Sequence, residues 1–316
     1  MGNLYTKRQV EELLFQMPFE ELQSIAFQTR QEYKGTHVFL RGLLEFSNYC
    51  QRNCLYCGLQ AQNKSIDRYV LTAEEIIEAG KQIKEAQMDT IVLQAGEWKH
   101  DPHWLAQLIK TLKEYYGLAI TLCVGETSKE NYALWKTAGA DRYLLRHETA
   151  DSSLYAKLHP NHTLKDRVKC LYHLKELGYE VGSGFLVGVP WQDEQSLLED
   201  IMLVQELGVA MCGIGPFIPQ KATPFADKEN GSFILTLRAV AALRIVMPWL
   251  NLPATTALET LYPNEGQKQG LRMGANVLMP SFTPEQNKKN YAIYNDKAQV
   301  KAENAKKLIT ELHLTY

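Results

Sequence analysis

Short apolar runs alternate with amphipathic stretches along most of this chain. The apolar runs are rich in Val, Ile and Leu and end in turn residues, which is typical of strands: Leu43–Ser47, Thr90–Gln94, Ala119–Val124, Arg142–Arg146, Glu180–Val187, Met211–Pro216, Leu252–Ala257 and Ala275–Met279. The stretches between them predict helices: Thr72–Gln87, Asp101–Tyr116, Ser128–Ala138, Thr163–Leu177, Asp193–Leu207, Ser232–Val246 and Asn264–Gly270. Eight strands alternating with helices predict an α/β fold, a (β/α)8 TIM-type barrel rather than an open doubly wound sheet.

Both ends of the chain carry additions to this pattern. Residues 1–35 have helical spacing that ends at Gly35, and they predict an N-terminal helical cap packed outside the barrel. Residues 284–316 are polar and include a predicted helix, Ala298–Leu312. We therefore expect a helical extension at 1–35, a barrel at 36–283 and a C-terminal helical tail at 284–316 that covers one end of the barrel.

Composition narrows the possible partners and the compartment. The 316 residues carry a net charge of −2, and every apolar run is far shorter than the ~20 residues of a membrane helix. We expect no nucleic-acid and no membrane partner. Six cysteines are too few for a disulfide scaffold, so a reduced, cytoplasmic protein is expected. Cys123, Cys170 and Cys212 lie in apolar contexts and are expected to be small buried side chains.

The remaining three cysteines lie together after the first predicted strand. Cys50, Cys54 and Cys57 have the spacing C-x3-C-x2-C, and thiolates are the soft ligands that iron–sulfur clusters need. A zinc site is the alternative, but it normally has four ligands in two pairs, and no second pair exists here. The missing fourth ligand favours a cluster completed by a small molecule. Tyr56, inside the motif, either packs for structure or stacks on an adenine.

Polar residues at strand ends supply the other candidate site groups, because barrel chemistry lies at the carboxyl ends of the strands. Glu97, after the small-residue turn Ala95-Gly96, is either an acceptor for an ammonium group or an exposed loop acid. Strand alternation places Arg146 and Glu148 on one face, with His147 opposite. We expect this pair to point into the barrel mouth and to meet Arg167, with a surface ion-pair cluster as the alternative.

The cysteine motif after the first strand of an α/β barrel, with a tyrosine before the third cysteine, resembles the radical S-adenosylmethionine (SAM) superfamily. That resemblance implies one [4Fe–4S] cluster held by Cys50, Cys54 and Cys57, with SAM bound to the open iron. The family cleaves SAM reductively to methionine and a 5′-deoxyadenosyl radical. Gln94-Ala95-Gly96-Glu97 resembles the family's glycine-rich motif that holds the SAM amino group, although Ala95 replaces a common glycine.

Longer stretches resemble one subfamily, the HydE-type maturases of FeFe-hydrogenases, more than biotin synthase or methylornithine synthase. They include 138–150, 213–219, 253–257 and 274–280. The resemblance implies that Glu148 contacts the SAM ribose and Arg167 its carboxylate. The implied cofactor-binding set is Tyr56, Gln94, Gly96, Glu97, Glu148, Arg167 and Val187. The implied substrate-binding set is Thr121, Arg146, Thr255, Thr256, Met279 and Tyr291.

The same resemblance implies a small-molecule or organometallic substrate, a cysteine-bound Fe(CO)2CN complex in hydrogenase H-cluster maturation. It also implies reduced ferredoxin or flavodoxin as electron donor and other hydrogenase maturases as partners. Many relatives bind a second cluster through cysteines near the C-terminus, but no cysteine follows Cys212 here, so one cluster is expected. Three alternatives stay open: a mutase acting on a free amino acid, as methylornithine synthase does, a HydE-like enzyme for another small thiol, and a cluster carrier without radical chemistry.

Overall fold

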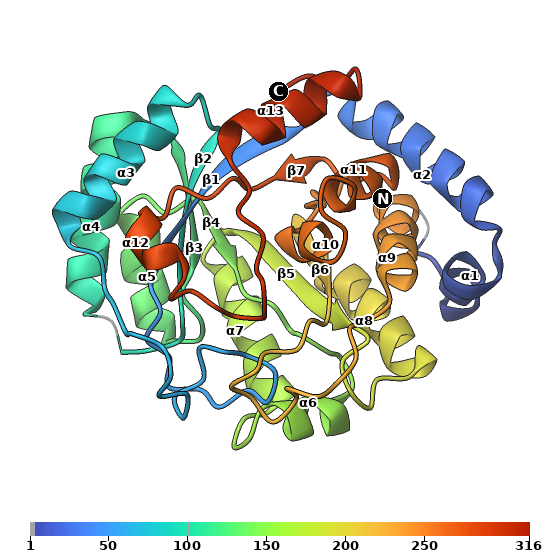
Figure 1. The fold of residues 1–316 in the computed structure, drawn as a ribbon, viewed down its shortest axis with the longest axis horizontal. Coiled ribbons are helices and arrows are strands. Elements are labelled where there is room, and N and C mark those ends of the chain that lie inside the picture. The colour runs from blue at the N-terminus through green and yellow to red at the C-terminus, as the bar shows by residue number, and fades with distance from the viewer. Residues whose placement is uncertain (1–3, 100) are drawn as a thin grey trace.

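A parallel sheet of seven strands forms the centre of the protein (Figure 1). The computed structural model describes residues 4–99 and 101–316, so residues 1–3 of the expected N-terminal extension lie outside it. The sheet order is β6-β5-β4-β3-β2-β1-β7. The strands are β1 Phe39–Ser47, β2 Thr90–Ala95, β3 Ala119–Cys123, β4 Arg142–Leu144, β5 Glu180–Val187, β6 Met211–Pro216 and β7 Val277–Leu278. This curled parallel sheet with outer helices confirms the predicted α/β barrel class.

The predicted strand Leu252–Ala257 is wrong. This segment makes only isolated bridges, from Asn251 to Met211 and from Pro253 to Val277. Proline has no N–H for a sheet ladder, and the helix α10 (Thr256–Leu261) begins where the strand was expected to end. The segment still connects β6 to β7, because Cys212 N donates to Asn251 O at 3.0 Å and Ala254 N donates to Val277 O at 3.0 Å.

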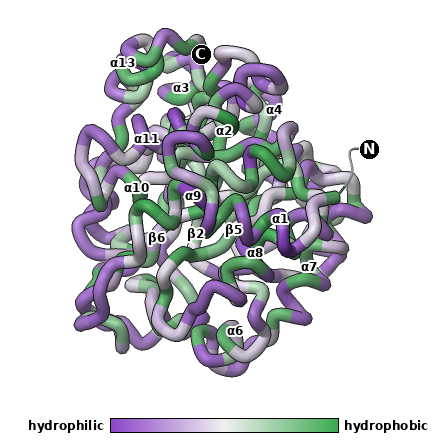
Figure 2. The backbone as a smooth tube through the Cα atoms, turned by 90° about the vertical axis from the view of Figure 1, so that its right-hand side faces the viewer, coloured by the Kyte–Doolittle hydropathy of each residue, from purple (hydrophilic) through white to green (hydrophobic). Residues whose placement is uncertain are grey.

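Helices cover the outside of the sheet, and all of them except α6 (Ser152–Leu158) were expected from the sequence. They are α3 Ala73–Glu85, α4 Pro102–Tyr116, α5 Lys129–Thr137, α6 Ser152–Leu158, α7 Leu164–Glu176, α8 Glu194–Leu207, α9 Phe233–Val246 and α11 Gly266–Arg272. The capping box that begins α3 is present: Glu75 N donates to Thr72 Oγ1 at 3.2 Å, and Thr72 N donates to the Glu75 carboxylate at 2.8 Å. Figure 2 shows mainly hydrophobic residues along the central strands and mainly hydrophilic residues in the outer loops.

The two terminal segments pack onto the barrel rather than standing apart. The helices α1 (Lys7–Glu11) and α2 (Phe19–Lys34), with a π-helical turn at Glu12–Gln16, lie against α8 and α9 (Figure 1). The C-terminal segment contains α12 (Glu285–Lys288) and α13 (Ala302–Glu311). One apolar core includes Val10 and Ile309 together with the strands. In the described part of the chain, no helix combines the length and apolar character needed to cross a membrane.

Candidate active site

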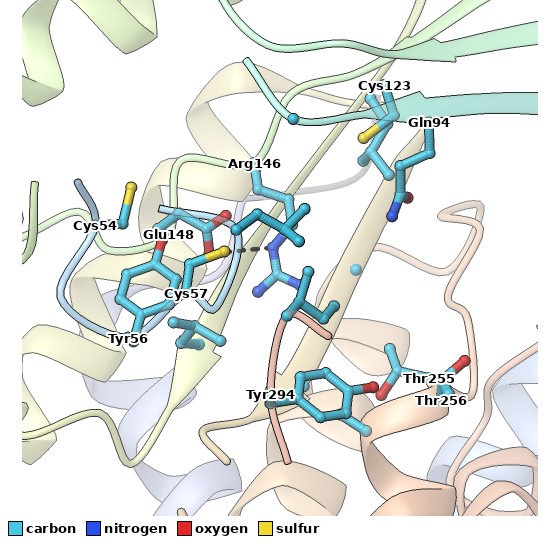
Figure 3. Close-up of a pocket in the computed structure, with 18 of the residues that line it drawn as sticks. Cys54, Tyr56, Cys57, Gln94, Cys123, Arg146, Glu148, Thr255, Thr256 and Tyr294 are labelled. Atoms are coloured by element: carbon cyan, nitrogen blue, oxygen red, sulfur yellow. Dashed lines mark hydrogen bonds and ion pairs between the residues drawn. The ribbon is translucent and has the colours of Figure 1, made fainter. Parts of the chain in front are cut away.

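A cavity of about 340 Å³ opens among the carboxyl ends of the strands (Figure 3). Its wall on β6 carries glycines, Gly213 and Gly215, where other strands place side chains. The volume is in the range of small-ligand sites. The predicted site residues that line it are Cys50, Cys54, Tyr56, Cys57, Gln94, Gly96, Glu97, Arg146, Glu148, Arg167, Thr255, Thr256, Met279 and Tyr291.

The three cysteines of the motif share this cavity and come from the loop between β1 and α3. The loop is fixed by Arg68, whose guanidinium donates to four backbone carbonyls: Asn48 at 2.5 Å, Leu59 at 2.9 Å, Gln60 at 2.7 Å and Asn63 at 3.2 Å. Burial raises the pKa of Cys57 to about 12 and raises that of Cys54 well above its ordinary value. Without a bound cation these thiols are therefore protonated at neutral pH, and a metal is needed to hold them as thiolates.

The donor set fits an iron–sulfur cluster. Each thiolate of such a cluster binds a different iron, so the sulfurs need not converge on one point. Among the described residues, no three His, Cys, Asp or Glu side chains are placed to hold a single ion. Gly96 brings the backbone after β2 against the cysteine loop, since a Cβ there would lie 2.2 Å from Tyr49 O and 2.8 Å from Cys50 Cβ. Only glycine permits this approach.

Two glutamates and two arginines form a closed charge network beside the cysteine loop. Arg167 Nη2 donates to Glu97 Oε1 at 2.7 Å, and Arg167 Nε lies 2.6 Å from Glu126 Oε1. Arg52 donates to Glu97 Oε2 at 2.8 Å and to Glu126 Oε2 at 2.7 Å. Burial opposes ionisation of Glu97, but the guanidiniums of Arg167 and Arg52 outweigh it and lower its pKa to about 2. The Glu97 side chain is 18% exposed, so the alternative of an exposed loop acid is wrong.

Arg146 and Glu148 point into the cavity together (Figure 3). Arg146 Nε lies 3.2 Å from Glu148 Oε2. His147 is buried on the other side, with its Nδ1 2.9 Å from Ser183 Oγ and its Nε2 3.6 Å from Asp200. Arg146 and Glu148 therefore lie on one face and His147 on the other, as predicted. The alternative of a surface ion-pair cluster is wrong.

Two details of that prediction are wrong. The strand β4 ends at Leu144, before Arg146, and Glu148 has a left-handed φ of 66° while its N–H donates to Gly184 O at 2.9 Å. Arg167 does not meet the Arg146–Glu148 pair. Its partners are Glu97, Glu126 and the hydroxyl of Tyr155, because the first turn of α7 lies beside the loops that follow β2 and β3.

Tyr56 is held inside the cavity wall. Its hydroxyl lies 2.8 Å from His159 Nε2, and the two rings meet edge to face. Burial lowers the pKa of His159 to about 3, so its imidazole is neutral at physiological pH. The neutral ring nitrogen can accept a hydrogen bond from the Tyr56 hydroxyl, which fixes the orientation of Tyr56. This contact fixes the Tyr56 ring. It is compatible with both predicted roles, structural packing and stacking on an adenine.

Two predicted residues lie outside the cavity lining. Thr121 is on β3 one inward-facing position below Cys123, and its buried hydroxyl has no hydrogen-bond partner in the described structure. The Val187 side chain is fully buried in the apolar core. Gln94, in contrast, faces the cavity and donates from Nε2 to Tyr291 OH at 3.1 Å.

Sequence reasoning missed several cavity residues. They are Glu45, His159, Tyr294 and Lys297, and Arg52 lay within the cysteine motif without an assigned role. Glu45 carried a usable signal, since it is a lone charge inside an apolar strand. Cys123 was expected to be a simple core residue, whereas it is partly buried and lines the cavity. Lys297 and Tyr294 come from an irregular segment, whose position no periodic pattern predicts.

Comparison with known proteins shows the family to which the chain belongs. The family described as "Radical SAM superfamily" matches residues 44–204. The chain is 46% identical over 282 residues to the [FeFe] hydrogenase maturase subunit HydE of Thermotoga maritima, covering 88% of this chain and 80% of that protein. It is 30% identical to 3-methylornithine synthase of Methanosarcina barkeri, over 93% of this chain and 84% of the relative.

A solved structure shows the same architecture. The crystal structure of methylornithine synthase (PylB) superposes with a TM-score of 0.89 and 27% sequence identity, covering 99% of this chain and 94% of the other. The sequence identities confirm the expected order, with HydE nearer than methylornithine synthase.

Proposed function

This chain belongs to the radical SAM superfamily, and from that premise we propose that it is a HydE-type maturase acting in the assembly of the FeFe-hydrogenase H-cluster. Membership makes it a radical SAM enzyme and implies a [4Fe–4S] cluster and SAM as cofactors. The observation that carries the proposal is one shared cavity, which collects the three cysteines, the Gly96 turn and five of the six implied substrate residues. When bound, cluster and SAM together supply an electron and a source of adenosyl radical.

The protein groups around the cysteines divide the work of holding SAM. Cys50, Cys54 and Cys57 would hold the cluster. Glu97 is ionised in the network and can accept hydrogen bonds from an ammonium group, while the Arg167 fork can bind a carboxylate bidentately. The Glu97 carboxylate and the Arg167 guanidinium lie 2.7 Å apart. The amino-acid part of SAM would replace this ion pair by two others, one between its ammonium and Glu97 and one between its carboxylate and Arg167. Glu148, which also lines the cavity, would accept hydrogen bonds from the ribose hydroxyls.

The substrate end of the cavity has a different character. Figure 3 shows Thr255, Thr256 and Tyr294 on the opposite side of the cavity from Cys54 and Cys57. Residues 290–297 cover the cavity from the cysteine loop to this side: Asn48 Nδ2 donates to Asn290 O at 2.8 Å and Gly58 N donates to Ile293 O at 3.0 Å, and Tyr294 and Lys297 line the cavity. Closure shields a reactive radical from water. Arg146 and the threonines are the proposed substrate contacts.

We propose a cysteine-bound Fe(CO)2CN complex as substrate, with reduced ferredoxin or flavodoxin as electron donor in the cytoplasm and other hydrogenase maturases as partners. The 46% identity to HydE supports this choice over a mutase acting on a free amino acid, such as 3-methylornithine synthase at 30%. A related enzyme for another small thiol would use the same cavity.

A complementation experiment tests the substrate proposal. The chain is expressed in a hydrogenase-producing strain that lacks its own HydE-type maturase, and hydrogen evolution is measured. Restored activity supports the proposal. No restoration, together with turnover of lysine to methylornithine by the purified enzyme, would favour the mutase instead. The matched control is the Cys54→Ala variant, which should restore nothing.

A further inference from the structure

The cavity wall contains a buried ion pair that the proposed function does not use. Glu45 on β1 is fully buried, and its Oε1 contacts the ammonium of Lys297, whose side chain is 10% exposed. Thr283 Oγ1 donates to Glu45 Oε2 at 3.1 Å and accepts from Glu45 N at 2.9 Å. Both charged side chains line the cavity. The acid is thus fixed on the barrel, and the cation is presented by the C-terminal segment.

The ammonium retains capacity for another ligand. A lysine ammonium has three N–H donors. Within the described structure its polar side-chain partner is the Glu45 carboxylate, and the ring of Tyr291 lies with its centroid 5.2 Å away. An aromatic face attracts the cation but satisfies a donor only weakly. Lys297 can therefore accept a second anion without giving up Glu45.

The pair is not needed to fasten the C-terminal segment. That segment is already tied down where Asn295 N donates to Pro219 O at 3.0 Å and Ala298 N donates to Thr260 Oγ1 at 2.9 Å. A buried ion pair is often no more stable than an apolar pair of similar volume, because both charges lose their hydration. Two charged side chains kept in the wall of a cavity, although the fold does not need their ion pair, indicate that the cavity binds a polar ligand there.

Its place in the cavity matches the substrate rather than SAM. Lys297 directly precedes Ala298, which bonds α10, and Tyr291 bonds Gln94 of β2. Figure 3 shows Gln94, Thr255, Thr256 and Tyr294 on the side of the cavity away from Cys54 and Cys57. The Glu97–Arg167 pair lies beside the cysteine loop instead.

We propose that Lys297, oriented by Glu45, is a specificity-determining residue that binds the carboxylate of an amino-acid substrate or of an amino acid carried by the substrate. This inference rests on the proposed radical SAM function and deepens it by naming the substrate's recognition group. A ligand without a carboxylate leaves the Lys297 donors unmatched in a desolvated site, which is a strong basis for discrimination. The cysteine-bound iron complex and a free amino acid both carry this group.

The test compares two small probes that differ only in the carboxylate, S-methyl-L-cysteine and 2-(methylthio)ethylamine. Binding to cluster-reconstituted, SAM-loaded protein is measured by saturation-transfer NMR titration. Loss of a charge-assisted contact costs roughly tenfold or more in affinity. The wild type should prefer S-methyl-L-cysteine by at least that factor. A wild type that binds both probes equally would overturn the inference.

Variants then assign the preference to the pair. The double variant Glu45→Gln/Lys297→Met avoids leaving a buried unpaired charge, and it should bind both probes within about threefold of each other. Lys297→Arg should restore part of the preference. Lys288→Met is the matched control, because Lys288 pairs with Glu285 on the same segment at 2.7 Å and lies outside this cavity. It should behave as the wild type.

Two different failures are distinguishable. A double variant that keeps the full preference would overturn the role of Lys297, whatever the enzyme does with SAM. A wild type that forms no 5′-deoxyadenosine would defeat the proposed function, and the binding data do not depend on turnover.

Discussion

Removing the Arg167 guanidinium should destabilise the protein strongly, because it leaves two buried carboxylates with one partner. In the native structure Arg167 is within 2.7 Å of Glu97 and 2.6 Å of Glu126, and its side chain is 7% exposed. Breaking a buried pair by deleting one partner costs about 3–5 kcal/mol. The pKa of Glu97 is consistent with this order of magnitude. Burial raises this pKa, but Arg167 and, to a smaller extent, Arg52 lower it from 4.5 to about 2, which corresponds to about 3 kcal/mol in favour of the carboxylate for the two guanidiniums together. Arg167→Met should therefore lower the free energy of unfolding by about 3 kcal/mol or more.

The assay is urea unfolding followed by circular dichroism, with a double-mutant cycle. Adding Glu97→Gln to Arg167→Met removes the unpaired charge, so the double variant should recover about 1–3 kcal/mol relative to the sum of the single variants. The pH dependence has a defined sign. Because the folded pKa of Glu97 lies below its ordinary value, its stabilisation is complete above about pH 4.5 and is lost as pH falls toward 2. Strictly additive single effects, or an unchanged unfolding midpoint for Arg167→Met, would refute the reasoning.

Three further predictions concern the loop and the cavity. Gly96→Ala should lower the free energy of unfolding by about 1–3 kcal/mol and weaken SAM binding, because its Cβ would lie 2.2 Å from Tyr49 O. SAM affinity is measured by calorimetry, and an unchanged affinity would contradict the close approach. Arg68→Met frees four carbonyls of the cysteine loop and should reduce the iron bound per chain after reconstitution, with full occupancy as the opposing result. Tyr291→Phe removes the acceptor for Gln94 and should raise the substrate KM several-fold, whereas an equal loss of SAM affinity would count against its assignment.

The parts of the fold that periodicity controls were predictable. Apolar runs such as Thr90–Ala95 and the capping box at Thr72 depend on short-range preferences that the sequence shows directly. The segment around Pro253 was mispredicted, because a short apolar run does not distinguish a strand from a bridge followed by a helix. The irregular path of residues 289–301 depends on long-range bonds to the barrel, which no local pattern encodes.

The sequence predicted many of the residues that share the candidate site, but not which of them contact one another. Strand ends locate Gln94, Arg146 and Glu148 at one edge, and the structure brings them to one cavity. The partners of Arg167 depend on how α7 packs beside two loops, so its pairing with Glu126 was not predicted. The Lys297–Glu45 pair joins residues 252 apart in the chain, and such contacts require the folded structure.

The central claim, that the three cysteines support reductive SAM cleavage, has a direct test. Wild-type protein is reconstituted anaerobically with iron and sulfide, reduced with dithionite, and incubated with SAM, and 5′-deoxyadenosine is quantified by liquid chromatography. Cys170→Ala is the matched control, since this cysteine on α7 lies outside the cavity. We expect 5′-deoxyadenosine from the wild type and Cys170→Ala and none from Cys54→Ala. No product from the wild type, or equal product from Cys54→Ala, would contradict it.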